Sequence, residues 1–549
     1  MLINVLKNNK NLLEKNNEDL LYAFNENNEK KIEINHPLFE VFTKLNLLYK
    51  YFINIGMKEI EEYNLKNDYI TIFDKLNKLN VNYSSIYFYY DGINIIKGLI
   101  ELKIDLNKIK RLGIDDINNK NKDENNNYLL QNLFSYNKFE TNLTYLDLNI
   151  SSHKYYIKRD VFETINKFKS LETLKLTGFN FNENENFIIK LTTLKTLSID
   201  ESSNLTISQN CCNNIKYLSL CDWNIEESDT LLEFPNAESF KLSQYDIFND
   251  IIDLNNSKKL KYFEGTIEDF TYLDENVPLQ YAGICTFYDD IETDIEKSGL
   301  KEMISIKTLT KIFLNMRKLN ISIIEGIHLK NYSVQKLEIN IDEMMGECML
   351  NYLLTKFPNL TYLDFSLSGS STNKNKTHIK IEENKNCNID HLYLVIYNHN
   401  NFIQLYCTSF DKLIEISLEL DCYISYLKRT LPIFNENCNV IFKSLTKFHF
   451  KYLTNRKFKL NILNNVFNNI ACMRNLKDFL LFCYNDVSDD FREKFIKKLL
   501  LLNLTNIYFR IDNNKDKKDE MFSENELKII NPNIDFSKYK EIYIYKKQI

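Results

Sequence analysis

The chain has 549 residues and carries 69 Lys and Arg against 75 Asp and Glu, so its formal net charge is -6. A protein that binds nucleic acid by neutralising phosphates usually has a basic excess, and its absence here argues against that class. The 44% hydrophobic content can bury a large core, but the length exceeds the roughly 250–300 residues of one compact domain. We therefore expect several domains or one elongated repeat array.

The start of the chain and its cysteines indicate a cellular compartment. Residues 1–17 lack the apolar stretch and cleavage site of a secretory signal, and no apolar run approaches the roughly 20 residues that cross a bilayer. The 11 cysteines are scattered and include no Cys-x-x-Cys pair, a pattern typical of reduced, mostly buried thiols. We expect a cytoplasmic protein that does not engage a membrane.

Helical periodicity is clearest near the start of the chain. Residues 37–55 place apolar side chains on one helical stripe, with Pro37 suited to the first helical position and Gly56 to the end. A second stripe follows in residues 68–79. We interpret residues 1–80 as an N-terminal helical cap that shields the first of the repeats that follow.

From residue 83 onward a six-residue pattern recurs, with apolar residues at positions one, four and six. The clearest copies lie at residues 143–148, 171–176, 194–199, 215–220 and 360–365. Further copies begin at Tyr83, Ile109, Ala237, Leu260, Leu279, Leu309, Val334, Ile389, Leu413, Leu445, Leu476, Leu504 and Tyr539. The 18 copies span 456 residues (539 minus 83), so their 17 intervals average about 27 residues, a period typical of solenoid repeats.

Each hexad and the segment after it predict one strand and one helix. The last four hexad positions alternate apolar and variable residues, the period of a short strand with one buried face. Apolar residues recur at helical spacing in residues 160–168, 349–357 and 490–502, and Asp160 is a candidate N-cap for the first. One such unit cannot enclose a core, but stacked copies form a parallel sheet with helices outside.

This hexad resembles the repeat of the leucine-rich repeat family over roughly residues 83–545. The resemblance implies an α/β solenoid, a curved horseshoe with parallel strands on the concave face and helices and loops on the convex face. Residues 81–549 would form this domain, with about 18 irregular repeats. The resemblance predicts a fold and leaves the function open.

A second interpretation of the N-terminal segment is open. Pro37-Leu38 followed by Phe42 and Leu45 resembles the opening of an F-box, a short helical module that precedes leucine-rich repeats in many ubiquitin-ligase substrate receptors. Residues 30–70 would then bind a cullin adaptor, and the repeats would recognise the substrate. The rest of the F-box pattern is not recognisable in this sequence.

The sequence offers no motif for catalysis or metal binding. Its seven histidines show no metal-ligand spacing with one another or with cysteine, and no His-Glu-x-x-His, Gly-x-Ser-x-Gly or Gly-rich phosphate loop occurs. We therefore expect a non-catalytic protein without a cofactor or metal. The alternative is an enzyme in which distant repeats bring histidine, cysteine or carboxylate side chains together on the inner face.

The hexad positions that alternate away from the core carry the candidate binding residues. Tyrosine recurs at positions three and five, and it provides a large amphipathic contact area at low entropic cost. Lysine and acidic residues are interleaved, which suits a protein or peptide partner better than nucleic acid. A plainer explanation is that tyrosine, with 34 copies, simply favours strands. The predicted partner-binding residues of the concave face are Tyr145, Tyr217, Tyr262, Tyr281, Tyr362, Tyr393 and Tyr508.

Overall fold

The computed structural model divides into two compact units, residues 1–228 and residues 229–549, which we describe separately. The residues that it describes are 31–33, 52–56, 85–89, 109–114, 130–134, 139–149, 155–180, 187–202, 205–221, 231–243, 252–274, 276–286, 293–319, 327–344, 348–349, 355–367, 378–381, 388–396, 402–405, 412–420, 444–452, 460–469, 473–484, 488–512 and 521–545.

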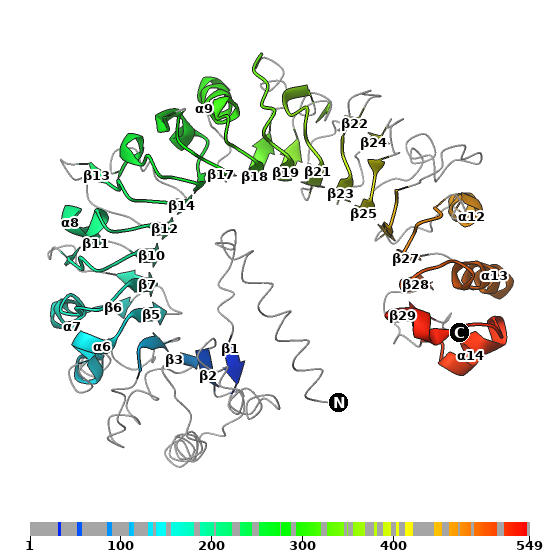
Figure 1. Ribbon diagram of the computed structural model, residues 1–549, viewed down its shortest axis with the longest axis horizontal. Coiled ribbons are helices and arrows are strands. Elements are labelled where there is room, and N and C mark those ends of the chain that lie inside the picture. Colours follow the sequence, from blue (N-terminus) through cyan, green and yellow to red (C-terminus); the bar gives the residue numbers. More distant parts are fainter. Residues whose placement is uncertain are drawn as a thin grey trace, which may run out of the picture. The chain divides into compact units, whose positions relative to one another are not determined.

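Unit 1 is a single layer of parallel strands. Strands that are consecutive in the layer pair in chain order, with the helices and small sheets on the outer side (Figure 1). The layer contains β1 (Lys31–Glu33), β2 (Phe52–Gly56), β3 (Ser85–Tyr89), β4 (Arg111–Ile114), β5 (Tyr145–Asn149), β7 (Thr173–Thr177), β10 (Thr196–Asp200) and β12 (Tyr217–Cys221). Outside it lie α6 (Phe139–Asn142), α7 (Arg159–Ile165), α8 (Gln209–Cys212) and the parallel pairs β6 (Tyr155–Tyr156) with β8 (Phe179–Asn180) and β9 (Phe187–Ile189) with β11 (Leu205–Ile207).

Unit 2 repeats this plan over more strands. Its parallel layer contains β14 (Ser239–Ser243), β16 (Tyr262–Gly265), β17 (Tyr281–Thr286), β18 (Lys311–Leu319), β19 (Lys336–Met344), β21 (Tyr362–Leu367), β23 (His391–Ile396), β25 (Glu415–Leu420), β26 (Lys447–Tyr452), β27 (Asp478–Tyr484), β28 (Asn506–Asp512) and β29 (Glu541–Ile544). On the outer side lie α9 (Thr293–Ser305), α12 (Leu460–Asn469), α13 (Asp489–Leu500), α14 (Glu524–Ile530), η4 (Leu254–Asn256), η5 (Glu268–Tyr272) and η10 (Phe536–Lys538). Two small parallel sheets accompany them, β13 (Leu232–Glu233) with β15 (Ile252–Asp253), and β20 (Cys348–Met349) with β22 (His378–Ile381) and β24 (Phe402–Leu405).

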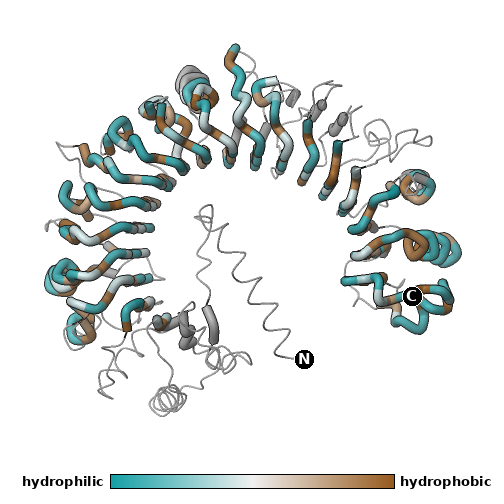
Figure 2. The backbone as a smooth tube through the Cα atoms, viewed as in Figure 1, coloured by the Kyte–Doolittle hydropathy of each residue, from teal (hydrophilic) through white to brown (hydrophobic). Residues whose placement is uncertain are grey.

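Every predicted hexad contributes one of these strands, so the repeat prediction is confirmed. From β3 to β29, each strand of the two layers begins at the third position of a hexad. The parallel register joins equal hexad positions, as in Leu174, Leu197 and Leu218 of β7, β10 and β12. Hydrophobic and hydrophilic residues alternate accordingly along the repeats (Figure 2). The apolar positions form the core. This fixes the register of the strands, because a one-residue slip would turn the apolar side chains outward.

A threonine ladder ties successive repeats together at the second hexad position. The backbone carbonyl at this position accepts N–H groups from positions two and three of the next repeat, as Lys110 does from Thr144 and Tyr145. Where position two is threonine, its hydroxyl donates to the same carbonyl at 3.0–3.4 Å. This occurs at Thr144, Thr310, Thr361, Thr446 and Thr505. The ladder fixes the start of each strand relative to the one before it.

The predicted outer helices are confirmed in two of three places. Helices α7 and α13 occupy the expected stretches, and their apolar residues are buried except for the half-exposed Phe491 of α13. The predicted N-cap Asp160 is wrong, because α7 begins after Lys158 and Asp160 lies in its first turn, where a carboxylate favours the helix dipole. The third stretch begins differently, since Met349 belongs to β20, and residues 350–354 lie outside the described chain.

The predicted helix of residues 37–55 does not extend to its expected end. Residues 52–56 form β2, which pairs in parallel with β1 and β3. Ile53 and Ile55 are β-branched and alternate in this stretch, which favours a strand over the last helical turn. The remaining residues of the predicted cap and of the F-box hypothesis lie outside the described residues, apart from β1, so both stay predictions.

Most of the described cysteines are buried, and the described helices are short. Cys211, Cys212 and Cys483 are buried in the core, and burial raises the pKa of the Cys211 thiol to about 12. A thiol of such high pKa is unreactive at neutral pH. Among the helices that the structure describes, none is both long and apolar enough to cross a membrane.

Candidate functional site

Hexad positions three and five line the inner side of each layer, and we call them rows three and five. The parallel register places equal positions of neighbouring strands side by side. In unit 2, row three consists of Ser239, Tyr262, Tyr281, Lys311, Lys336, Tyr362, His391, Glu415, Lys447, Asp478, Asn506 and Glu541. Row five consists of Lys241, Glu264, Gly283, Phe313, Glu338, Asp364, Tyr393, Ser417, His449, Leu480, Tyr508 and Tyr543.

Tyr262 and Tyr281, which we call the buried pair, stack in row three of β16 and β17. Their ring centroids are 4.1 Å apart and their planes differ by 1°. Only 7% of Tyr262 and 3% of Tyr281 is exposed. The rings have room because row five holds Gly283 here, where a Cβ atom would lie 3.1 Å from Cε1 of Tyr281. A side chain in row five would therefore compete with the pair for the same space.

Glu264, a carboxylate that is only 4% exposed, holds the buried pair from row five. Its Oε2 accepts a 2.7 Å hydrogen bond from the Tyr262 hydroxyl, and its Oε1 lies 3.4 Å from the Lys241 ammonium. The Cys285 thiol also donates to Oε1. Burial raises the pKa values of Tyr262 and Tyr281, so both hydroxyls stay protonated at neutral pH. The Tyr281 hydroxyl has no hydrogen-bond partner among the described residues, and this end of the rows presents little accessible surface.

Two lysines and Glu338 connect the buried pair to the next aromatic group. The ammonium groups of Lys311 and Lys336 each lie 2.9 Å from one carboxylate oxygen of Glu338. Lys311 also covers the ring of Tyr281 at 5.2 Å, and Lys336 covers the ring of Tyr362 at 4.1 Å. Burial opposes the charge of Glu338, but the two lysines outweigh it and lower its pKa. The group is a fixed arrangement of charges on the sheet.

Tyr362 in row three of β21 and Tyr393 in row five of β23 form what we call the open pair. Their ring centroids are 5.2 Å apart, the rings are tilted by 34°, and both side chains are half-exposed. Burial and nearby carboxylates raise the pKa of Tyr362 to about 12. Burial and a hydrogen bond from its hydroxyl to Glu415 raise the pKa of Tyr393. Both rings are held by neighbours and remain accessible from the inner side.

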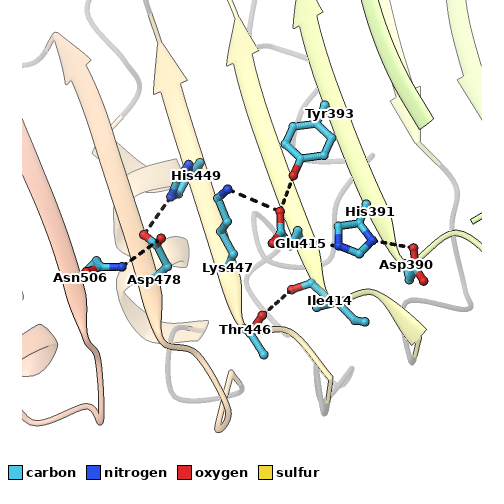
Figure 3. A network of polar contacts seen from close by, with 10 residues as sticks. All are labelled: Asp390, His391, Tyr393, Ile414, Glu415, Thr446, Lys447, His449, Asp478 and Asn506. Carbon is cyan, nitrogen blue, oxygen red and sulfur yellow. Dashed lines mark hydrogen bonds and ion pairs between the residues drawn. The ribbon is translucent and has the colours of Figure 1, made fainter. Parts of the chain in front are cut away.

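A polar network surrounds Glu415 on β23, β25 and β26 (Figure 3). Glu415 accepts the Tyr393 hydroxyl and lies 3.4 Å from the Lys447 ammonium. Its second oxygen is 4.0 Å from Nε2 of His391, whose Nδ1 is 2.6 Å from Asp390. Lys447 compensates the charge of Glu415, and each contact restricts its neighbour's side chain. The open pair therefore stands beside groups whose positions are already fixed.

A second polar group lies beside the first on β26, β27 and β28. Nε2 of His449 is 2.9 Å from Asp478, whose other oxygen accepts a 3.3 Å hydrogen bond from Asn506 (Figure 3). Ser417 neighbours His449 in row five, but no hydrogen bond joins them, as a nucleophile and its base require. The described residues also contain no group of three His, Cys, Asp or Glu side chains placed to hold a metal ion. His449, Asp478 and Asn506 offer polar contacts to a ligand.

All seven predicted tyrosines lie in row three or five, but their accessibility differs. The structure brings together Tyr262 with Tyr281 and Tyr362 with Tyr393. Tyr508 is half-exposed and lies 5.4 Å from the ring of Tyr545. The remaining two belong to unit 1, where Tyr145 is buried and Tyr217 is half-exposed. A partner on unit 2 would meet the open pair and Tyr508, and could reach little of the buried pair.

Several residues of the rows were missed from the sequence. His391, His449 and Glu415 entered no motif, although each occupies a row position of its hexad. Lys311 and Lys336 were likewise overlooked. Hexad position alone would have identified all of them, because the rows follow directly from the repeat register.

The sequence matches no protein-family model and no curated protein. Among solved structures it is similar to an internalin, InlF, from Listeria monocytogenes, with 14% identity, a TM-score of 0.27, and coverage of 69% of this chain and 82% of that one. It is also similar to a plant peptide hormone receptor, RGFR1, in complex with RGF2, with 13% identity, a TM-score of 0.25, and coverage of 85% and 90%. Similarity at these TM-scores supports no argument about function, so the inner rows themselves are the guide to it.

Proposed function

We propose that the chain is a non-catalytic protein-interaction module of the cytoplasm that binds a protein or peptide partner on the inner rows of unit 2. The observation that supports this most is the open pair of Tyr362 and Tyr393, half-exposed beside an ordered array of paired charges. Aromatic anchors surrounded by polar groups are the usual composition of a protein-binding surface. Their fixed positions reduce the entropy that a partner loses on binding.

Charge pairing favours a protein partner over a polyanion. In the rows of unit 2, Lys241, Lys311, Lys336 and Lys447 each lie within 3.4 Å of a carboxylate oxygen on a neighbouring or the same strand. A polyanion would have to displace these carboxylates from their lysines. A protein partner can instead add hydrogen bonds at the edges of the pairs and pack on the open rings.

Loss of the open pair should weaken partner binding without unfolding the chain. We expect a Tyr362→Ala, Tyr393→Ala double variant to bind its partner more than about tenfold more weakly, because exposed aromatic anchors each contribute more than about 1 kcal/mol. Partners would be captured from a lysate of the source organism, identified by quantitative mass spectrometry, and their dissociation constants measured with purified proteins. Thermal unfolding would show that the variant is folded.

Tyr332→Ala is the matched control, because Tyr332 is 61% exposed but precedes the hexad that begins at Val334 and so lies outside the rows. It should bind the same partners as the unaltered chain. Equal binding by the control and the double variant would refute the proposal that the inner rows of unit 2 are the binding surface.

A further inference from the structure

Asp364 differs from every other carboxylate in rows three and five between β16 and β28. Four of them have hydrogen-bond or ion-pair partners on the chain: Glu264, Glu338, Glu415 and Asp478. Asp364 makes neither kind of contact with the described residues, although it is only half-exposed. A partly desolvated carboxylate without a counter-charge is an unfavourable arrangement that a cation would relieve.

The lysines nearest to Asp364 are engaged elsewhere. Lys311 and Lys336 both contact Glu338, which neighbours Asp364 in row five. Burial, followed by the charge of Glu338, raises the pKa of Asp364, and the two lysines compensate only in part. The chain thus places two carboxylates side by side and directs its own cations to one of them.

The open pair borders Asp364 on its own strand and on the next. Tyr393 is its row-five neighbour on β23, and Tyr362 precedes it by two residues on the same face of β21. The Tyr362 hydroxyl makes no hydrogen bond with the described residues, so it can accept one from an incoming N–H group. The two rings offer apolar surface for an aliphatic stem. A carboxylate, a hydroxyl and apolar ring surface together match a lysine or arginine side chain.

We propose that Asp364, Tyr362 and Tyr393 form a subsite that receives one lysine or arginine side chain of the protein partner. The cationic head pairs with the Asp364 carboxylate and donates to the Tyr362 hydroxyl, while the stem packs along the open pair. This inference rests on the proposed function and specifies the chemistry of the partner at one point of the interface.

A peptide library displayed on phage tests the subsite even before the natural partner is identified. Random dodecamers would be selected on the full chain and then synthesised, and their dissociation constants measured for the unaltered chain and variants. We expect selected peptides to share a lysine or arginine and to lose affinity for the Tyr362→Ala, Tyr393→Ala variant. Asp364→Asn should weaken them by about 10- to 100-fold, the usual effect of removing a charged hydrogen-bond partner. Glu493→Gln, an exposed carboxylate on the outer helix α13 and outside the rows, is the control and should leave affinity unchanged.

A double-mutant cycle separates a direct contact from a general effect of charge. Replacing the shared basic residue of the peptide by norleucine should cost the same as Asp364→Asn, and the two changes together should cost little more than either alone. Asp364→Asn should also fold normally, because it removes an uncompensated charge; its thermal midpoint should equal or exceed that of the unaltered chain.

The outcomes distinguish the subsite from the proposed function. Peptides that need the open pair but share no basic residue, or that bind the Asp364→Asn variant equally well, would overturn the subsite and leave the binding surface in place. Selections that yield no peptide dependent on Tyr362 and Tyr393 would count against both.

Discussion

Unit 2 contains two tyrosine pairs that the repeat pattern places on the same face of the sheet and that differ in accessibility. Tyr262 and Tyr281 stack in parallel and are almost fully buried, with one hydroxyl bonded to the buried Glu264. Tyr362 and Tyr393 are tilted and half-exposed. The same residue type on the same face of the same sheet is therefore structural in one place and available for contact in another.

The neighbouring row-five residue explains the difference. Gly283 has no side chain, and the Tyr281 ring occupies the space that a side chain there would need. Row five instead holds Asp364 beside Tyr362, and the rings of Tyr362 and Tyr393 are tilted and half-exposed. Unit 1 shows the same relation, since a Cβ atom on the row-five residue Gly113 would collide with the ring of the buried Tyr87. A glycine in row five thus predicts buried tyrosines around it.

The largest expected effect is on the free energy of unfolding, which a substitution in the buried pair should lower much more than one in the open pair. Tyr262→Ala should lower the free energy of unfolding by about 4 kcal/mol, because it removes a buried, stacked ring and leaves Glu264 without its hydroxyl donor. Tyr362→Ala should cost about 1 kcal/mol, since its ring is half-exposed and its hydroxyl bonds to none of the described residues. Urea unfolding followed by circular dichroism measures both. Similar losses for the two variants would contradict the division into a buried and an open pair.

The repeat architecture was predictable from the sequence because each strand is encoded locally. Even the irregular hexads at Leu260 and Leu279 form β16 and β17, although Gly265 and Ala282 stand at apolar positions. Their neighbours supply the register, so one weak position does not prevent pairing. The N-terminal segment was harder, since residues 52–55 belong to the predicted helix of residues 37–55 and yet form part of β2.

The candidate site was only partly predictable, because accessibility depends on other strands. Row membership follows from the hexad, which is why all seven tyrosines lie on the expected face. Burial of Tyr281 depends on Gly283 and Glu264, and the second of these lies one repeat away. The pairing of Glu415 with Lys447 likewise joins residues separated by a full repeat. Such contacts arise from stacking and leave no local signal in the sequence.

The next largest expected effect is on stability and depends on pH, and it comes from the buried carboxyl group of Asp269. Asp269 in η5 is fully buried; one oxygen accepts two bonds from Thr266, and the other has no hydrogen-bond partner among the described residues. Burial raises its pKa to about 6. The folded protein therefore holds this proton more tightly than the unfolded chain, and stability that is present below about pH 4 is lost as the pH rises through 6.

Asp269→Asn should remove this dependence, because asparagine carries no charge at any pH. Relative to the variant, the unaltered chain should lose about 3 kcal/mol of stability between pH 4 and pH 7.5. Urea unfolding of both proteins at the two pH values gives the difference, in which other titrating groups cancel. A difference that does not change with pH would mean that Asp269 stays ionised when buried. Asp364, in the rows beside the open pair, should show a smaller effect because it is half-exposed.

The smallest effect tests the glycine itself. Gly283→Ala places a methyl group 2.9 Å from Cγ of Glu264 and 3.1 Å from Cε1 of Tyr281, so one of these buried side chains must shift, at about 1–2 kcal/mol. Ser417→Ala, a row-five change on β25 beside the half-exposed Tyr393, should cost less than about 0.5 kcal/mol. If Gly283 is needed to leave space for the Tyr281 ring, then Gly283→Ala should lower the free energy of unfolding much less in a Tyr281→Ala background, where the ring is absent. If Gly283→Ala costs the same in the Tyr281→Ala background, then the contact of the added methyl group with Glu264, and not with Tyr281, is what destabilises the protein. The burial of the pair would then depend on Glu264 rather than on the space that Gly283 leaves.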